Sequence, residues 1–284
     1  MTVEEIISEI LSKRPDVSRD QLLEALGSER SKTGGLIADV TLLRLIAARH
    51  GVEVPLEGII NRKLSIGILI PQLNDVTICG RVIAVSPTRT FEGEKSGKYA
   101  SLTIADRDGT LRIMLWNDKV NLVESGELRV GLVARFSHGY TRSDRNGGTE
   151  LHLSEKSKIE ISPQGIIVED FPTIDDVAIK INKIDGSESI VHLSGSVKEV
   201  SPLSTFTRQD QTSGKVVRFM LSDETGNVSV VVWNEKAEEL EKKVKRDAKV
   251  RLVNARVKAS SGGGFEVHVD ASAYVDVSGS EPAR

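Results

Sequence analysis

The side chains with the clearest chemical potential are two tryptophans, Trp116 and Trp233, because each ends a run in which apolar residues recur at every second position. Strand side chains alternate between the two faces of a sheet, so the apolar members of a run show which face is buried. Leu111, Ile113 and Leu115 share one phase, which predicts the interior of a domain. Trp116 falls in the other phase. An exposed indole ring offers a flat surface on which another flat ring, such as a nucleobase, can stack.

The second tryptophan follows the same rule. Val228, Val230 and Val232 predict an interior face, and Trp233 again lies out of phase with them. A large aromatic at the same outward position twice costs solubility unless the ring is covered or used. We therefore interpret both rings as base-stacking surfaces. The alternative is that each ring packs under the following helix or under a linker between domains.

Basic residues accompany both tryptophans. The same alternation places Arg112 beside Trp116 and turns Arg218 outward on the strand before Trp233. A guanidinium group can pair with a phosphate or stack on a base, and basic residues mixed with aromatics suit a groove that follows a nucleic-acid backbone. The remaining candidates for single-strand contact lie in the first inter-strand loop, in the strand after it and in the late hairpin: Arg89, Phe91, Lys98, Arg142, Phe206, Arg208, Lys215, Lys258 and Phe265.

Three of these aromatics have a structural alternative. Phe91 and Phe206 align with each other, and both rings could close the mouth of a domain as part of its core. Phe265 is in phase with Val267 and Val269, which have the character of core residues, so packing and stacking are equally open for it.

The tryptophans belong to an internal repeat. CGRVIAVSPTRTF aligns with SGSVKEVSPLSTF, SGKYASLTIADRDGTLRIMLWND aligns with SGKVVRFMLSDETGNVSVVVWNE, and ELHLS aligns with EVHVD. Each copy contains a long strand, a polar loop, a hairpin, a short helix after the Trp-Asn pair and two strands joined by a Gly-rich turn. Five strands with a helix between the third and the fourth is the order of the OB-fold, a partly open barrel that binds single strands or sugars.

The stretch before the repeat is helical in pattern. Ile6, Ile7, Ile10 and Leu11 have helical spacing, and Ser18 is the predicted N-cap of a second helix. We therefore predict a mainly β protein, with two tandem OB-fold five-stranded barrels preceded by a small N-terminal helical bundle. The expected parts are a helical domain over 1–55, the first OB-fold over 65–162, a linker over 163–186, the second OB-fold over 187–278 and a disordered tail over 279–284.

Composition narrows the range of functions. A net charge of -3 argues against bulk coating of nucleic acid, so phosphate binding must come from a localised basic groove. The single cysteine, Cys79, can form neither an internal disulfide nor a cysteine-based zinc site. No apolar run is long enough to cross a bilayer, and the acidic start MTVEEI is unlike a secretion signal. These features predict an intracellular protein, cytoplasmic and associated with the nucleoid.

Catalytic motifs are missing from the sequence. It contains no Walker-type glycine loop, no GxSxG and no paired-His metal motif, which predicts a non-enzymatic protein without catalytic residues, cofactors or metal. His152 and His268 occupy equivalent strand positions, and we interpret them as ordinary strand residues.

Over roughly residues 65–277 these motifs resemble replication protein A, in the large-subunit type of archaea and eukaryotes. The resemblance implies a sequence-tolerant single-stranded-DNA-binding protein that protects DNA in replication, repair and recombination. In that family the aromatic that closes the third strand stacks on a base, which corresponds here to Trp116 and Trp233. The basic residue four positions earlier corresponds to Arg112, whereas the second copy has Ser229.

The resemblance also implies which loop residues contact DNA. Family contacts in the first inter-strand loop fall on Arg89 and Phe91 and, by the repeat, on Phe206 and Arg208, while a late-hairpin aromatic corresponds to Phe265. Other replication or repair proteins are expected partners through the N-terminal helices. Two other functions stay open: an OB protein that binds RNA or tRNA, and an interaction scaffold whose tryptophans anchor partner proteins.

Overall fold

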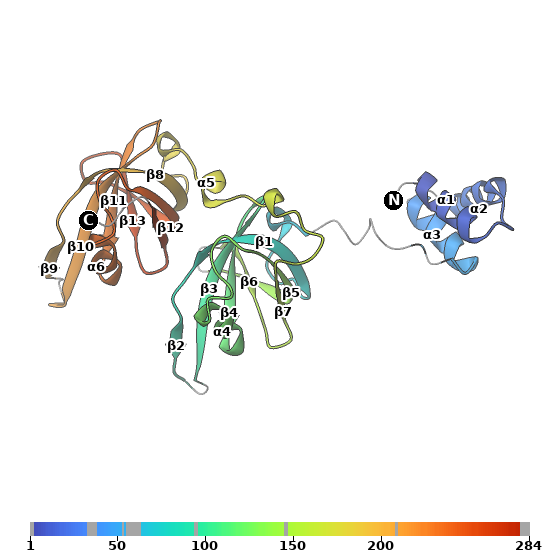
Figure 1. Ribbon diagram of the computed structural model, residues 1–284, viewed down its shortest axis with the longest axis horizontal. Coiled ribbons are helices and arrows are strands. Elements are labelled where there is room, and N and C mark those ends of the chain that lie inside the picture. The colour runs from blue at the N-terminus through green and yellow to red at the C-terminus, as the bar shows by residue number, and fades with distance from the viewer. Residues whose placement is uncertain are drawn as a thin grey trace. The chain divides into compact units, whose positions relative to one another are not determined.

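The computed structural model describes residues 3–32, 39–52, 54, 64–93, 96–144, 147–207 and 210–278. The chain divides into two compact units, residues 1–63 and residues 64–284 (Figure 1). Arg208 and the expected tail over 279–284 lie outside the described residues. Among the helices that are described, none has the length and apolar character needed to cross a membrane.

The first unit is a bundle of the helices α1 (Val3–Lys13), α2 (Arg19–Lys32) and α3 (Asp39–Arg49). Ile6, Ile10 and Leu43 are among the residues that form its buried apolar core. Ser18 caps α2 as predicted, because its Oγ accepts a hydrogen bond from the Gln21 backbone N–H at 3.2 Å and its own N–H donates to Gln21 Oε1 at 2.9 Å. This reciprocal pair satisfies two backbone donors that a helix start leaves free.

The second unit begins with the first barrel. Strands β1, β3, β4, β6 and β5 pair in that order, and β5 pairs again with β1, so the five strands close into a ring. Strand β4 runs parallel to β6, and the other pairs of the ring are antiparallel. The elements are η1 (Ile66–Ile68), β1 (Val76–Val85), β2 (Arg89–Phe91), β3 (Gly97–Asp106), β4 (Gly109–Trp116), η2 (Asn117–Val120), α4 (Asn121–Glu124), β5 (Val133–Ser143), β6 (Thr149–His152) and β7 (Lys158–Ile161).

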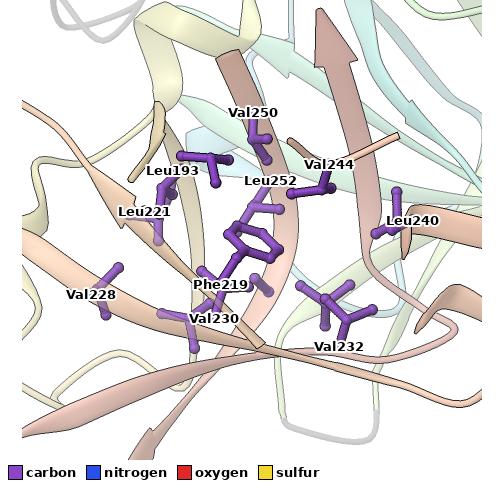
Figure 2. Packing of buried hydrophobic residues seen from close by; sticks show 14 of the residues in the cluster. Leu193, Phe219, Leu221, Val228, Val230, Val232, Leu240, Val244, Val250 and Leu252 are labelled. Carbon is purple, nitrogen blue, oxygen red and sulfur yellow. The ribbon is translucent and has the colours of Figure 1, made fainter. Parts of the chain in front are cut away.

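The second barrel repeats this ring with β8, β10, β11, β13 and β12. Phe219 lies in the middle of its core among branched aliphatic side chains from several strands, and Leu240 of the helix that follows the tryptophan strand belongs to the same cluster (Figure 2). The elements are η4 (Ile181–Lys183), β8 (Ile190–Val200), β9 (Ser204–Thr207), β10 (Ser213–Ser222), β11 (Asn227–Trp233), α6 (Glu235–Glu241), β12 (Lys249–Ala259), β13 (Phe265–Val269) and β14 (Tyr274–Ser278).

The segment between the barrels contains η3 (Val168–Asp170) and α5 (Ile174–Val177) and is held from both sides. Arg81 of the first barrel donates from Nη2 to the Val168 carbonyl at 2.7 Å. Arg251 of the second barrel donates from Nε to Asp175 Oδ1 at 3.0 Å, and the hydrogen bonds of Arg251 to this carboxylate hold the pKa of Asp175 well below its ordinary range. The segment is therefore a packed connection along much of its length.

Candidate nucleic-acid interface

Both tryptophans lie on the outer face of their barrels. Leu111, Ile113 and Leu115 belong to the first core, whereas Trp116 at the end of β4 is half-buried and outside that core. In the second barrel, the alternate residues of β11 likewise face the core and Trp233 is half-buried at the strand end. The alternation in the sequence thus assigned the faces of both strands.

A phenylalanine packs edge-on against each tryptophan. The ring centroids of Phe91 and Trp116 are 5.9 Å apart with an interplanar angle of 83°, and those of Phe206 and Trp233 are 5.6 Å apart at 79°. Edge-to-face pairs are a favoured arrangement of aromatic rings. Neither phenylalanine is part of a buried core cluster, so these rings belong to the outer face together with the tryptophans.

A glycine makes room for each phenylalanine. Phe91 pairs across strands with Gly97, and Phe206 pairs with Gly214. A Cβ atom at either glycine would overlap the phenylalanine ring. A side chain at these positions would therefore push the ring away from its tryptophan.

In the first barrel the aromatic surface continues across three further rings. The ring centroids of Tyr99 and Trp116 are 5.7 Å apart. His152 stacks beside Trp116 with ring centroids 6.1 Å apart and an interplanar angle of 20°. Tyr140 stacks on His152 with ring centroids 5.3 Å apart and an interplanar angle of 27°. The guanidinium carbon of Arg142 stands 5.1 Å from the centre of the Tyr140 ring. The result is a row of flat rings that ends in an exposed cation.

The second barrel has fewer rings at the matching places. His268 lies next to Trp233, with ring centroids 5.6 Å apart and an interplanar angle of 32°. Val216 lies opposite Trp233 in the strand register, at the position that Tyr99 occupies in the first barrel. Arg256 lies opposite His268, at the position that Tyr140 occupies in the first barrel. A valine and an arginine thus replace two rings of the aromatic surface, and Arg256 forms an ion pair with Asp270 at 3.0 Å.

The predicted arginines surround these surfaces. Arg112 is exposed on β4, two residues from the buried Met114, and Arg218 is exposed on β10 directly opposite Val231 of the tryptophan strand. Arg89 is exposed on β2 opposite Tyr99. Each guanidinium therefore lies on or beside a face that carries a tryptophan, and a guanidinium group can pair with an anion such as a phosphate.

The two predicted lysines of β3 and β10 are engaged within the protein. Lys98 donates to Asn121 Oδ1 at 2.8 Å and forms an ion pair with Glu124, and Lys215 forms an ion pair with Glu238. Both carboxylates come from the helical segment that follows the tryptophan strand. These lysines therefore tie that segment to the barrel.

The two predicted residues in the late hairpin of the second barrel lie on opposite sides of the sheet. Lys258 is exposed on β12 and lies opposite Glu266 of β13 in the strand register. Phe265 is adjacent to Glu266 along β13 and points to the opposite side of the strand, where its ring lies against Gly186. The structure does not bring Phe265 to the face that carries Trp233.

The histidines of these faces were not among the predicted site residues. His152 and His268 are almost fully buried, at 6% and 7% exposure, and each contacts a tryptophan ring. The signal was present in the sequence, because Glu150 and His152 align with Glu266 and His268 and alternate in the phase of the tryptophan face. Among the described residues, no group of three or more His, Cys, Asp or Glu side chains could hold a metal ion.

Two stretches of the chain, residues 76–168 and 191–272, match the family described as the OB-fold nucleic acid binding domain. Together they make up more than half of the sequence, and the chain belongs to this family. The predicted fold class of two OB-folds behind a helical segment is confirmed.

Among individual proteins, the chain is similar to replication factor A from Methanothermobacter thermautotrophicus, with 29% identity over 163 residues, 57% of this chain and 20% of that protein. The chain thus spans only about a fifth of the length of this curated relative. The predicted resemblance to replication protein A is confirmed by this similarity.

One solved structure agrees with this chain in fold. A replication protein A heterotrimer bound to ssDNA matches with a TM-score of 0.52 and 19% identity, over 80% of this chain and 52% of its own. A replication factor A related protein from Methanobacterium thermoautotrophicum, solved in solution, is 31% identical over 36% of this chain and 91% of its own, with a TM-score of 0.32.

Proposed function

We propose that this chain binds single-stranded DNA without catalysing a reaction, by stacking bases on Trp116 and Trp233 while nearby arginines contact phosphates. The observation that carries the proposal is the repeated arrangement in which a phenylalanine packs edge-on against a half-buried outward tryptophan in both barrels. Every base has a flat face, so stacking of this kind tolerates any sequence.

The relatives support the same function. One relative is a replication factor A, and the replication protein A heterotrimer matched above is bound to ssDNA. By this similarity the chain protects single strands during replication, repair and recombination inside the cell. No cofactor is required for stacking or for phosphate contact. The binding domains are residues 65–162 and 187–278, and the helices of residues 1–55 dock partner proteins.

Two binding domains in one chain gain from each other. Once the first barrel holds a strand, the second encounters the same strand at a high effective concentration that the connecting segment sets. The affinity of the whole chain therefore exceeds that of either barrel. Salt weakens the binding because each phosphate contact releases counterions from the strand.

The function is tested by titrating the full chain against fluorescently labelled oligo-dT at low salt and following the anisotropy. We expect saturable binding that weakens with salt, weak competition by duplex DNA, and weaker competition by oligo-U than by oligo-dT. Competition by oligo-U at least as strong as that by oligo-dT would assign the chain to RNA instead. Absence of any binding at low salt would leave the tryptophans as anchors for protein partners.

A further inference from the structure

In the second barrel, a hydrogen-bonded chain runs from the tryptophan ring to a carboxylate. Trp233 Nε1 donates to His268 Nδ1 at 3.0 Å, and His268 Nε2 lies 2.6 Å from Glu266 Oε1. All three side chains lie on the same face, since Glu266 and His268 alternate along β13, which runs parallel to the tryptophan strand.

The hydrogen bonds determine the protonation of the histidine. The indole Nε1–H can only donate, so His268 Nδ1 must be the acceptor and carry no proton. The ring proton therefore sits on Nε2 and is donated to the Glu266 carboxylate. Each hydrogen-bonded group fixes the orientation of the next, so Glu266 restrains the Trp233 ring through His268.

The first barrel has the same three residues with one bond missing. His152 Nε2 lies 2.8 Å from Glu150 Oε1, as in the second barrel. Trp116 Nε1 and His152 Nδ1, however, are both buried and have no hydrogen-bond partner among the described residues. A buried polar atom without a partner is unfavourable, so the Trp116 ring lacks a restraint that the Trp233 ring has.

We propose that His268 and Glu266 are positioning residues that hold Trp233 in its base-stacking orientation, and that this restraint makes the second barrel the more preorganised of the two. The proposal deepens the single-strand-binding function proposed above and rests on it for its meaning in DNA binding. Preorganisation strengthens binding because the ring loses less freedom when a base stacks on it.

The hydrogen bond can be tested without DNA. The chain has two tryptophans, so a ¹H–¹⁵N spectrum shows two indole signals, which Trp116→Phe and Trp233→Phe assign. We expect the Trp233 indole proton to resonate downfield of the Trp116 proton and to exchange more slowly with water. His268→Leu should shift the Trp233 signal and remove its protection while leaving the Trp116 signal in place. His152→Leu is the matched change in the first barrel, and it should leave the exchange rate of the Trp116 proton about the same.

The role in DNA binding is tested by a double-mutant cycle on oligo-dT affinity. His268→Leu should weaken binding several-fold, and His268→Asn, which keeps an acceptor oxygen near the position of Nδ1, should restore part of the loss. Phe at position 233 can stack but has no N–H to donate. In the Trp233→Phe background, His268→Leu should therefore have no further effect on affinity.

The outcomes separate this proposal from the proposed function. If wild-type chain fails to bind oligo-dT, single-strand binding is wrong, while the indole signals still report whether the hydrogen bond exists. If the chain binds oligo-dT and His268→Leu lowers affinity equally with Trp or Phe at position 233, the histidine acts on the fold and not through Nε1, and the positioning role is overturned. Indole protons that exchange equally fast in both barrels would overturn it as well.

Discussion

The two barrels share a scaffold and differ on the face that carries the tryptophan. In the first, Trp116 lies among Phe91, Tyr99 and His152, and its indole nitrogen has no partner among the described residues. In the second, Val216 takes the place of Tyr99, and Trp233 is hydrogen-bonded to a histidine. The first face offers more aromatic surface and the second a more constrained ring. Both barrels keep the phenylalanine, tryptophan and histidine of this face, and they differ in the residues around those rings.

The largest effect should follow from removing the rings. Trp116→Ala and Trp233→Ala should each weaken oligo-dT binding by roughly 5- to 150-fold, because stacking contributes about 1–3 kcal/mol per base. The Trp233 change should cost more, since Val216 leaves less aromatic surface beside it. The double variant should lose roughly the product of both. Anisotropy titrations measure the losses and circular dichroism checks folding; a folded double variant with unchanged affinity would contradict the account.

The next effect is a loss of stability in acid, which should be larger for the second barrel than for the first. Burial lowers the pKa of His192 in the second barrel to about 4, and its Nδ1 accepts the Asn254 backbone N–H at 3.1 Å. The unfolded imidazole takes a proton near pH 6.5, so between about pH 6.5 and pH 4 the unfolded state binds more protons. Stability of the second barrel should fall as the pH falls through this window, by up to about 3 kcal/mol.

The loss of stability in acid can be measured for each barrel separately. Trp116→Phe leaves Trp233 to report thermal unfolding of the second barrel, and Trp233→Phe leaves Trp116 to report the first, which has Thr77 at the position equivalent to His192. The transition reported by Trp233 should move down more between pH 7 and pH 4. His192→Gln should remove this difference. Equal shifts in both barrels would assign the acid sensitivity to other groups.

A smaller effect is expected from the glycines beneath the phenylalanines. Gly214→Ala and Gly97→Ala should displace Phe206 and Phe91 from the tryptophan edges, because an added Cβ overlaps each ring. Loss of an edge-to-face pair corresponds to about 1 kcal/mol, or roughly fivefold in affinity. Near-ultraviolet circular dichroism should report the lost ring contact. Gly27→Ala in α2, where nothing lies within 4 Å of the added Cβ, is the matched control and should change neither signal.

The smallest effects should come from single arginines. Arg112→Ala and Arg218→Ala should each weaken binding a few-fold at moderate salt and reduce the slope of log affinity against log salt by about 0.7, the value for one phosphate contact on a single strand. Lys245→Ala, an exposed change in the connection between α6 and β12, should leave the slope unaltered. An unchanged slope in both arginine variants would remove them from the interface.

Much of this fold could be predicted because its two copies carry the same local signals. Alternating apolar residues define the inner face of each strand, and the aligned turns set the strand order. The same alternation placed Trp116, Trp233, Arg112 and Arg218 on outer faces, where the structure has them. Period-two patterns are local, so sequence alone is enough to read them.

The parts that could not be predicted depend on contacts between distant segments. The sequence predicts Lys98 and Lys215 as contacts to a single strand, and only the folded chain shows that the helical segment after each tryptophan strand supplies a carboxylate to them. His268 reads as an ordinary strand residue until the parallel pairing of β11 and β13 brings it to Trp233. A partner chosen by tertiary packing leaves no pattern in the neighbouring sequence.

The central claim, that both barrels stack bases on unequal tryptophan platforms, is tested most directly by the fluorescence of single-tryptophan chains titrated with oligo-dT. The Trp116→Phe chain reports on Trp233, and the Trp233→Phe chain reports on Trp116. We predict quenching of both tryptophans in parallel with binding, to different extents, since the two rings have different neighbours. Binding of oligo-dT that leaves the fluorescence of one or both rings unchanged would contradict the account.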